Sequence, residues 1–192
     1  NISFKFEDTQ VELLKNIDLH VASGEKICLS GFTGSGKSLL LQIIAGLYDD
    51  YTGSVAFNGI PIRNWDMEDL RSHIGDFVAN GDIFHGTLEE NITLDKPGIT
   101  LDDVQKIAEI VGLTEFVESL PDGYNTVMVP EGKNLAEHIR RRINLARSLV
   151  GNPRLVMLED DFNLMAEEYK QNLLNYLMAE KWTVIAVSND PD

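Results

Sequence analysis

Gly31-Phe32-Thr33-Gly34-Ser35-Gly36-Lys37-Ser38 is the stretch of sequence that decides the fold of this chain. It fits the pattern G-x-x-x-x-G-K-[ST], the phosphate-binding P-loop, at every fixed position. The residues before it, 26–30, read as a short buried strand. The residues after it, 39–47, are apolar almost all round and read as an interior helix. A P-loop connects a strand to a helix, so the surrounding sequence predicts the structure that the motif requires.

Each residue type in this stretch has a physical role in binding a phosphate chain. Glycines let the backbone curl so that successive N–H groups point at phosphate oxygens, and the following helix adds unpaired N–H groups and a positive dipole end. Lys37 adds a charge for the β- and γ-phosphates, and the Ser38 hydroxyl can ligate Mg²⁺. A glycine-rich turn without a ligand is the less consistent alternative for a complete motif. The residues predicted to bind the nucleotide are Gly31, Thr33, Gly34, Ser35, Gly36, Lys37 and Ser38.

The composition limits the class of protein and its partners. The chain has 192 residues, which suits one domain, and a formal net charge of −15, which argues against nucleic acid as a partner. Cys28 is the only cysteine, so no intrachain disulfide can form, and we expect it to be buried in the strand before the P-loop. No apolar run is long enough to span a membrane and no signal peptide is evident. The start at Asn1 rather than Met suggests a piece of a larger protein.

Periodicity predicts the remaining strands and helices. We expect strands at 2–6, 17–21, 53–57 (closed by an Asn58-Gly59 turn), 74–78, 155–158 and 183–187, and helices at 66–73, 164–180 and in several pieces between 87 and 149. Thr100 and Asp103 form a predicted capping box, and Asn134 is a candidate cap for a helix over 135–150. The two last strands are apolar throughout and separated by a helix, which indicates a parallel sheet covered on both faces.

These elements together predict an α/β fold. It should consist of a P-loop NTPase core, made of a mostly parallel sheet with helices on both faces, a small antiparallel β layer and a helical subdomain. We expect a single domain over 1–192, with the core at about 1–78 and 151–192 and the helical subdomain at about 79–150.

Acidic residues follow the apolar strand at 155–158. A P-loop enzyme needs a carboxylate at the C-terminal edge of a neighbouring parallel strand to hold the water shell of Mg²⁺. Glu159 stands at this position, and Asp160 follows it where a base that activates water could lie. Acidic residues at a strand end can also form a solvated loop, but an intact P-loop in the same chain favours the metal-binding interpretation.

Five stretches resemble motifs of the ATP-binding cassette (ABC) transporter family, and the resemblance covers essentially the whole chain. Besides the P-loop, residues 84–92 (FHGTLEENI) are similar to the F-S-G-T-I-R-E-N-I segment of exporter-type members, and residues 120–126 (LPDGYNT) to their L-P-x-G-Y-x-T run. Residues 142–149 resemble the R-I-A-L-A-R-A-L helix after the family signature, and residues 153–160 resemble the Walker B strand, P-K-I-L-L-L-D-E. The chain is therefore similar to the nucleotide-binding domain of an exporter.

The resemblance implies that the chain binds ATP with Mg²⁺ between two cassettes packed head to tail, the P-loop of one facing the LSGGQ signature of the other. ATP binding and hydrolysis would drive a transmembrane domain, fused or separate, and place this chain at the cytoplasmic face of the membrane. Phe6 matches an aromatic residue that stacks on adenine, although it could equally be an inward-facing strand residue. Family members continue past Asn189, so C-terminal helices are expected to be missing from this chain.

The chain departs from the family pattern at several functional positions. Residues 135–139 (LAEHI) replace LSGGQ, so both glycines are lost and Glu137 brings a negative charge towards the partner's γ-phosphate. The family's Gln is replaced by Ala79 or Asn80, and the Walker B pair reads Glu-Asp instead of Asp-Glu. Asn189 stands where members carry a His that contacts the γ-phosphate; Asn can donate a hydrogen bond but cannot carry charge or move a proton.

These departures predict a cassette that binds Mg-ATP well but hydrolyses it slowly, with Lys37, Asp160 and Asn189 as the catalytic residues. Asp160 is one methylene shorter than the family's Glu, and a misplacement near 1 Å can cost about 100-fold in rate. One alternative is a regulatory or structural cassette that holds ATP without significant hydrolysis. Another is an unrelated P-loop enzyme such as a small-molecule kinase, for which the stretches between 84 and 160 would be coincidental.

Overall fold

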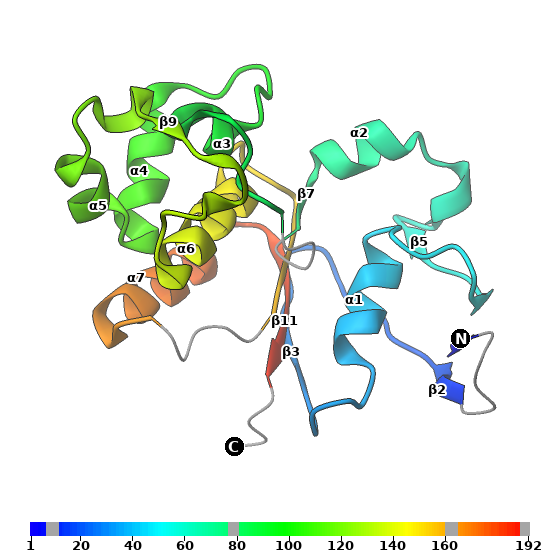
Figure 1. Ribbon diagram of the computed structural model, residues 1–192. Coiled ribbons are helices and arrows are strands. Elements are labelled where there is room, and N and C mark those ends of the chain that lie inside the picture. Colours follow the sequence, from blue (N-terminus) through cyan, green and yellow to red (C-terminus); the bar gives the residue numbers. More distant parts are fainter. Residues whose placement is uncertain (7–11, 77–80, 160–164, 189–192) are drawn as a thin grey trace.

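A four-stranded parallel sheet lies at the centre of the molecule (Figure 1). The computed structural model describes residues 1–6, 12–76, 81–159 and 165–188. In spatial order the strands are β3 (Lys26–Ser30), β11 (Thr183–Ser188), β10 (Leu155–Leu158) and β7 (Ile74–Asp76). All four residues of β10 are buried, as expected for a parallel strand covered on both faces. The prediction of an α/β fold with a parallel sheet is confirmed.

Two hydrophobic cores cover the two faces of this sheet. Successive side chains of a strand point to opposite faces. Val156 and Leu158 therefore belong to the core that most of the helices share, whereas Met157 and Ile185 belong to the core around α1 (Lys37–Ile44). Figure 1 shows helices on both sides of the sheet. The helices between 88 and 149 thus share one core with the central strands.

The small antiparallel strands lie on the same side of the sheet as α1 (Figure 1). The further elements on this side are β1 (Ile2–Lys5), β2 (Glu12–Ile17), β4 (Thr52–Gly53), β5 (Ala56–Phe57), β6 (Ile60–Pro61), the 3₁₀ helix η1 (Ile62–Asn64) and α2 (Met67–Ser72). β1 pairs antiparallel with both β2 and β4, and the buried side chains of Phe4 and Leu14 lie opposite each other. The β5–β6 hairpin turns at Asn58 and Gly59, which have φ angles of 52° and 78°, as the turn pair predicts.

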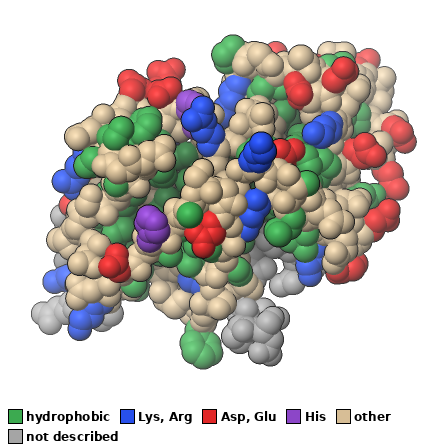
Figure 2. Space-filling view, turned by 180° about the vertical axis from the view of Figure 1, so that it is seen from behind, with side chains coloured by type: hydrophobic (Ala, Val, Ile, Leu, Met, Phe, Trp, Pro, Cys, Tyr) green, Lys and Arg blue, Asp and Glu red, His purple; other side chains and the backbone are tan. Residues whose placement is uncertain are grey.

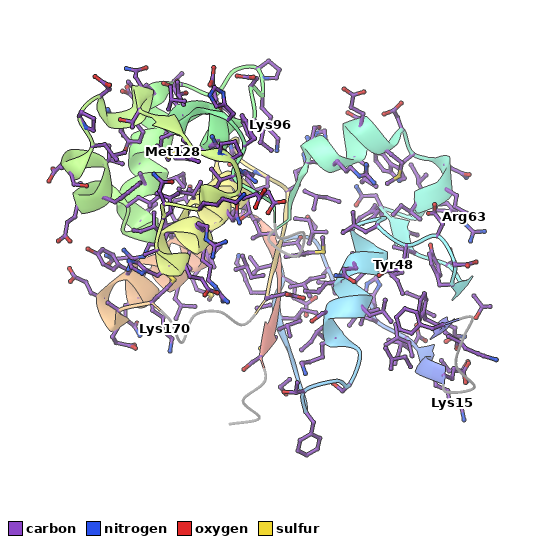
Figure 3. The ribbon with its side chains drawn as sticks, viewed as in Figure 1. Lys15, Tyr48, Arg63, Lys96, Met128 and Lys170 are labelled. Carbon is purple, nitrogen blue, oxygen red and sulfur yellow. The ribbon has the colours of Figure 1, made fainter. Side chains whose placement is uncertain are left out.

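The other face of the sheet carries the remaining helices. They are α3 (Leu88–Thr93), α4 (Leu101–Val111), α5 (Thr114–Ser119), α6 (Glu137–Leu149) and α7 (Glu167–Ala179), with η2 (Gly123–Asn125), η3 (Pro130–Gly132) and the short pair β8 (Gly86–Thr87) and β9 (Val127–Met128). The predicted capping box of Thr100 and Asp103 starts α4. Met128 is 3% exposed and lies among these helices (Figure 3).

Several predicted boundaries are wrong. The second strand covers 12–17 instead of 17–21, because Leu14 reaches the core opposite Phe4 while Leu19 is 39% exposed. Asn134 does not cap the helix that follows it: α6 begins at Glu137, and its N-cap residue makes no side-chain hydrogen bond. The helix expected at 164–180 covers Glu167–Ala179 in the structure.

Cys28 lies in the predicted strand but is exposed, which contradicts the expectation that it is buried. β3 is the edge strand of the sheet, and its residues Ile27 and Leu29 pack into the core around α1. Alternation therefore turns Cys28 to the opposite face. The periodicity of a single strand predicts which side chains share a face but does not tell whether another element covers that face.

Asn91 organises the segment between the sheet and the helices. Its side chain is 0% exposed. Its Oδ1 accepts a hydrogen bond from the N–H of Phe84 at 3.0 Å, and its Nδ2 donates to the carbonyls of Phe84 and Thr87, both at 3.0 Å. The backbone carbonyl of Asn91 accepts a bond from Nε of Arg147 in α6 at 2.8 Å, and burial lowers the pKa of Arg147. One buried amide thus ties the loop before α3 to the helices.

We predict that Asn91→Leu lowers the free energy of unfolding by about 2–3 kcal/mol, because it leaves partly buried main-chain groups of Phe84 and Thr87 without their partner. Urea unfolding monitored by circular dichroism measures the change. Asn125→Leu is the matched control, since Asn125 is an exposed residue on the same side of the sheet. A loss of stability that is the same for both variants would contradict the organising role of Asn91.

Candidate functional site

The P-loop closes around the side chain of Lys37. Its Nζ donates hydrogen bonds to the carbonyl oxygens of Gly31 at 2.7 Å and Phe32 at 2.9 Å and to Oγ of Ser35 at 3.3 Å. The N–H of Ser35 donates to the carbonyl of Phe32 at 3.2 Å, which tightens the same turn. The positive charge of Lys37 therefore lies inside the loop that joins β3 to α1. Its partners there are neutral oxygens, which an incoming anion could displace.

Two glycines of the P-loop have left-handed backbone conformations. Gly34 and Gly36 have φ angles of 83° and 87°. A Cβ atom at Gly34 would meet no other heavy atom within 4 Å, but a Cβ at Gly36 would lie 2.8 Å from Cδ2 of Leu14 and 3.4 Å from the carbonyl oxygen of Leu13. Leu14 is 3% exposed and so has little room to move. The loop thus needs glycine at position 36 for two reasons, its conformation and its packing on β2.

The N-terminus of α1 suits an anion. Among the described residues, no side chain caps this helix end and no acidic residue lies in its first turn. Lys37 and Ser38 are the first two residues of α1, and Ser38 is exposed, as are Thr33 and Ser35 of the loop. The first N–H groups of a helix have no partner within the helix and attract negative charge.

Glu159 reaches the same edge of the sheet as the P-loop. Leu158 pairs with Ala186, and Ser188 pairs with Ser30, so β10, β11 and β3 end at one edge. β11 lies between the other two, which corrects the expectation that the acidic strand is the direct neighbour of the P-loop strand. Parallel α/β sheets bind their ligands at this carboxyl edge.

The residues at this edge fit a magnesium ion bound together with phosphate. Oε1 of Glu159 is buried and has no hydrogen-bond partner among the described residues, so it is free to accept from a metal-bound water. Within the described ranges, no group of three or more His, Cys, Asp or Glu side chains could hold a metal by itself. Mg²⁺ needs no such cage, because it usually takes one or two carboxylates and completes its shell with phosphates and waters.

The predicted adenine contact, Phe6, follows β1 and is 44% exposed. Its ring packs edge-on against that of Phe4, with centroids 4.9 Å apart. Tyr48, which is labelled in Figure 3, packs on the same Phe4 ring at 5.7 Å. Phe4 is 4% exposed and is the inward-facing aromatic residue of this strand. The ring of Phe6 is only partly covered.

The segment that replaces the family signature forms the start of α6. Glu137 lies in the first turn, and its Oε1 accepts hydrogen bonds from Nε and Nη2 of Arg141 at 3.2 and 2.8 Å. These bonds, and then the charge of Arg141, lower the pKa of Glu137, so its carboxyl is ionised at neutral pH. The i, i+4 spacing of the two residues is visible in the sequence and could have revealed this pair.

Several predicted site residues lie outside the described residues. They are Ala79, Asn80, Asp160 and Asn189. A cavity of about 390 Å³ lies beside the start of α6, lined by Asp82, Glu131, Gly132, Lys133, Leu135 and Arg140. None of the P-loop residues lines it.

Comparison with known proteins distinguishes between the families that carry a P-loop. The sequence profile described as ABC transporter matches residues 14–163. The chain belongs to the ABC transporter family. Its P-loop, its acidic strand end and the segment from Phe84 to Ile92 are therefore features of an ABC ATPase domain, and the family binds ATP.

Relatives in this family are about three times longer than the chain. YgaD of Bacillus subtilis (strain 168), named as a multidrug export ATP-binding/permease protein, is 31% identical over 188 residues, which are 96% of this chain and 32% of YgaD. YfiB of the same organism, an ABC transporter ATP-binding protein, is 30% identical over 188 residues, or 98% of this chain and 33% of YfiB. The chain thus spans about one third of the length of these relatives.

The fold agrees with a solved ABC exporter. The structure of a bacterial Atm1-family ABC exporter with ATP bound matches 98% of this chain, and 34% of its own, with a TM-score of 0.85 and 24% sequence identity. This likeness confirms the arrangement of the parallel sheet, the small antiparallel sheets and the helices. None of the helices in the described ranges combines the length and the apolar character that crossing a membrane needs.

We predict that Gly34→Ala and Gly36→Ala differ in stability. A non-glycine residue in the left-handed conformation costs about 1–2 kcal/mol, which applies to both variants. Gly36→Ala should cost roughly twice as much as Gly34→Ala, because its Cβ also overlaps Leu14. Urea unfolding without nucleotide measures both. Equal losses would show that β2 does not pack on the P-loop as described.

Proposed function

We propose that this chain is the ATP-binding domain of an ABC exporter, which binds Mg-ATP and hydrolyses it slowly. The observation that carries the proposal is the P-loop closed around Lys37 at an uncapped helix end. Its proposed nucleotide ligands are the main-chain and side-chain groups of residues 31–38. Phe6, partly exposed at the end of β1, is proposed to stack on adenine.

Magnesium is proposed to bind between the P-loop and β10. The Ser38 hydroxyl would be one ligand, and Glu159, through its unpaired buried oxygen, would hold the water shell. When bound, Mg²⁺ supplies positive charge that neutralises the phosphate oxygens during hydrolysis. The protein side chains place the phosphates and keep the carboxylate at the sheet edge.

Slow hydrolysis is proposed from the residues around the γ-phosphate. Asp160 is the proposed base, one methylene shorter than Glu, and Asn189 replaces a residue that can carry charge. The start of α6 lacks the glycines and the hydroxyl of the family signature and carries Glu137 instead. The alternative is a regulatory cassette that binds ATP without significant hydrolysis, and the measured turnover separates the two.

The proposed partners are a transmembrane domain and a second cassette, with the chain at the cytoplasmic face of the membrane. YgaD is named as a fused ATP-binding and permease protein, which supports a transmembrane partner. Phe84, Val127 and Val129 are 38%, 55% and 44% exposed, and they offer apolar surface for such a contact. We also propose the division into a core at about 1–78 and 151–192 and a helical subdomain at about 79–150, because the described helices between 88 and 149 lie together on one side of the sheet (Figure 1).

The surface charge supports the expectation that nucleic acid is not a partner. Figure 2 shows acidic side chains along the margin of the helical side. Glu115 and Glu118 of α5 are exposed, and the whole chain has a net charge of −15. Such a surface repels a phosphate backbone.

We predict that isothermal titration with ATP and Mg²⁺ shows binding and that Lys37→Ala weakens it by about 100-fold or more, because the variant removes the charge of the loop that balances the phosphates. Lys170→Ala is the control, since Lys170 is a surface residue of α7 with a long ion pair of 3.9 Å to Glu167 (Figure 3). Absence of ATP binding by the unmodified protein, or binding that Lys37→Ala leaves unchanged, would refute the proposed function.

We predict that Asp160→Glu raises the turnover of ATP hydrolysis by about 10-fold or more, because it restores the reach of the proposed base. Asp160→Asn should abolish turnover, while both variants keep the affinity for Mg-ATP. Single-turnover hydrolysis of labelled ATP measures the rates. If all three proteins hydrolyse ATP at one rate, Asp160 is not the base.

A further inference from the structure

A row of four residues runs from the end of β1 to the P-loop. Phe6, which is proposed to stack on adenine, packs edge-on against Phe4, with ring centroids 4.9 Å apart. Phe4 is paired with Leu14 across β1 and β2, so the two side chains are neighbours on one face of this small sheet. Leu14 lies against the P-loop, because a Cβ atom at Gly36 would be only 2.8 Å from Cδ2 of Leu14. Two side chains therefore link the proposed adenine contact to the phosphate-binding loop.

Phe4 is the fixed member of this row. Phe4 and Leu14 are 4% and 3% exposed, whereas Phe6 is 44% exposed. A second ring also packs edge-on against Phe4: that of Tyr48, in the loop between α1 and β4, at 5.7 Å (Figure 3). Interiors are close-packed, so a buried ring with these neighbours has little freedom to turn. The orientation of the more exposed Phe6 ring therefore depends on Phe4.

An aromatic ring at position 4 does more than fill space. Aromatic pairs prefer edge-to-face or offset arrangements, with centroids about 4.5–7 Å apart. The rings of Phe4 and Phe6 are close to perpendicular, with an angle of 87° between their planes. Leucine at position 4 would keep an apolar contact with Phe6 but has no ring to set the plane of the Phe6 ring. That plane matters, because a base stacks on the face of an aromatic side chain.

The separation between the Phe6 ring and the P-loop matters as much as the plane of the ring. ATP has a base at one end and a triphosphate at the other. A ligand with two ends gains affinity from both only when the protein holds the two contacts at a matching separation. A triphosphate without a base needs only the P-loop. The link through Phe4 and Leu14 should therefore favour a nucleotide over a bare triphosphate.

We propose that Phe4 is a positioning residue for recognition of the nucleobase. It holds the ring of Phe6 in the plane, and at the distance from the P-loop, at which one ATP contacts both. The inference rests on the proposed function, because it takes Phe6 as the adenine contact and residues 31–38 as the phosphate site. Phe4 itself does not need to touch the nucleotide.

Titration of the intact protein with ATP and with inorganic tripolyphosphate, each with Mg²⁺, separates positioning of the base contact from a general loss of structure. Phe6→Ala should raise the Kd for ATP about 10-fold or more, and Phe4→Leu about 5-fold or more, because stacking on the base is lost or weakened. Both variants should leave the Kd for tripolyphosphate within about 2-fold of the original. If Phe4→Leu weakens both ligands alike, or neither, the inference is overturned.

Phe57→Leu is the matched control. Phe57 is partly buried against the same core, but it lies in β5, which belongs to a separate two-stranded sheet. The same exchange of ring for leucine should therefore leave the Kd values for ATP and for tripolyphosphate within about 2-fold of the original. If Phe57→Leu weakens ATP as selectively as Phe4→Leu does, the effect is not specific to the row from Phe6 to the P-loop and the inference is overturned.

A double variant tests whether Phe4 acts through Phe6. Phe4→Leu in the Phe6→Ala background should weaken ATP binding no further, because the ring that Phe4 positions is already absent. Additive losses would overturn the inference. If circular dichroism shows that Phe4→Leu does not fold, Tyr48→Ala takes its place. It should raise the Kd for ATP about 3-fold and leave tripolyphosphate unchanged, with Tyr48→Phe restoring the original value. An unchanged Kd for ATP in Tyr48→Ala would then overturn the inference.

The same titrations distinguish failure of this inference from failure of the proposed function. If Phe6→Ala leaves the ratio of the two Kd values unchanged while Lys37→Ala weakens both ligands, the P-loop binds phosphate but Phe6 is not the base contact, and the inference is overturned. If the unmodified protein binds neither ATP nor tripolyphosphate, the proposed function is refuted and the inference with it.

Discussion

The hydrogen bonds of the Lys37 ammonium determine the shape of the candidate site. Two carbonyls and one hydroxyl of the P-loop surround this one charge, so a cation holds the turn between β3 and α1 together with the packing of Gly36 on Leu14. The chain has a net charge of −15, and its overall field repels a nucleotide. A local positive charge at a helix end is therefore the feature that an acidic protein needs in order to bind a polyanion.

The parallel register of the sheet brings the other half of the site to the P-loop. β3 and β10 end at the same edge because both pair with β11, and this places Glu159 at the same edge of the sheet as the P-loop. The sequence predicts that β10 and β11 are parallel, because both are apolar throughout and a helix separates them, and it predicts a buried strand before the P-loop. It does not predict that β11 lies between β3 and β10, because the order of strands depends on the paths of the connecting segments, which local patterns do not encode.

Local signals were the most reliable guide to the fold. The Thr100 capping box and the Asn58-Gly59 turn appear as predicted, because each depends only on residues within a few positions of each other. The predictions of a strand over 17–21 and of a buried Cys28 are wrong, because both depend on which distant elements cover a strand. The sequence does not predict the role of Asn91 for the same reason. Its side chain is polar, and nothing nearby in the sequence indicates that it is fully buried and bonded to the loop before α3.

At the start of α6, the contact of Glu137 with Arg141 changes the expected effect of the Glu137 charge. The sequence alone predicts that Glu137 brings a negative charge that repels the γ-phosphate of ATP bound to a second cassette. In the structure its carboxylate is bonded to Arg141, and the two side chains are 62% and 32% exposed, so their charges offset each other and solvent screens what remains. Repulsion of the phosphate is then the smaller part of the effect that we expect this segment to have on ATP hydrolysis. The larger part is chemical, because an ionised carboxylate only accepts hydrogen bonds, and a phosphate oxygen needs donors. The slow hydrolysis that we propose would therefore follow from the donors that this segment lacks more than from the charge that it carries.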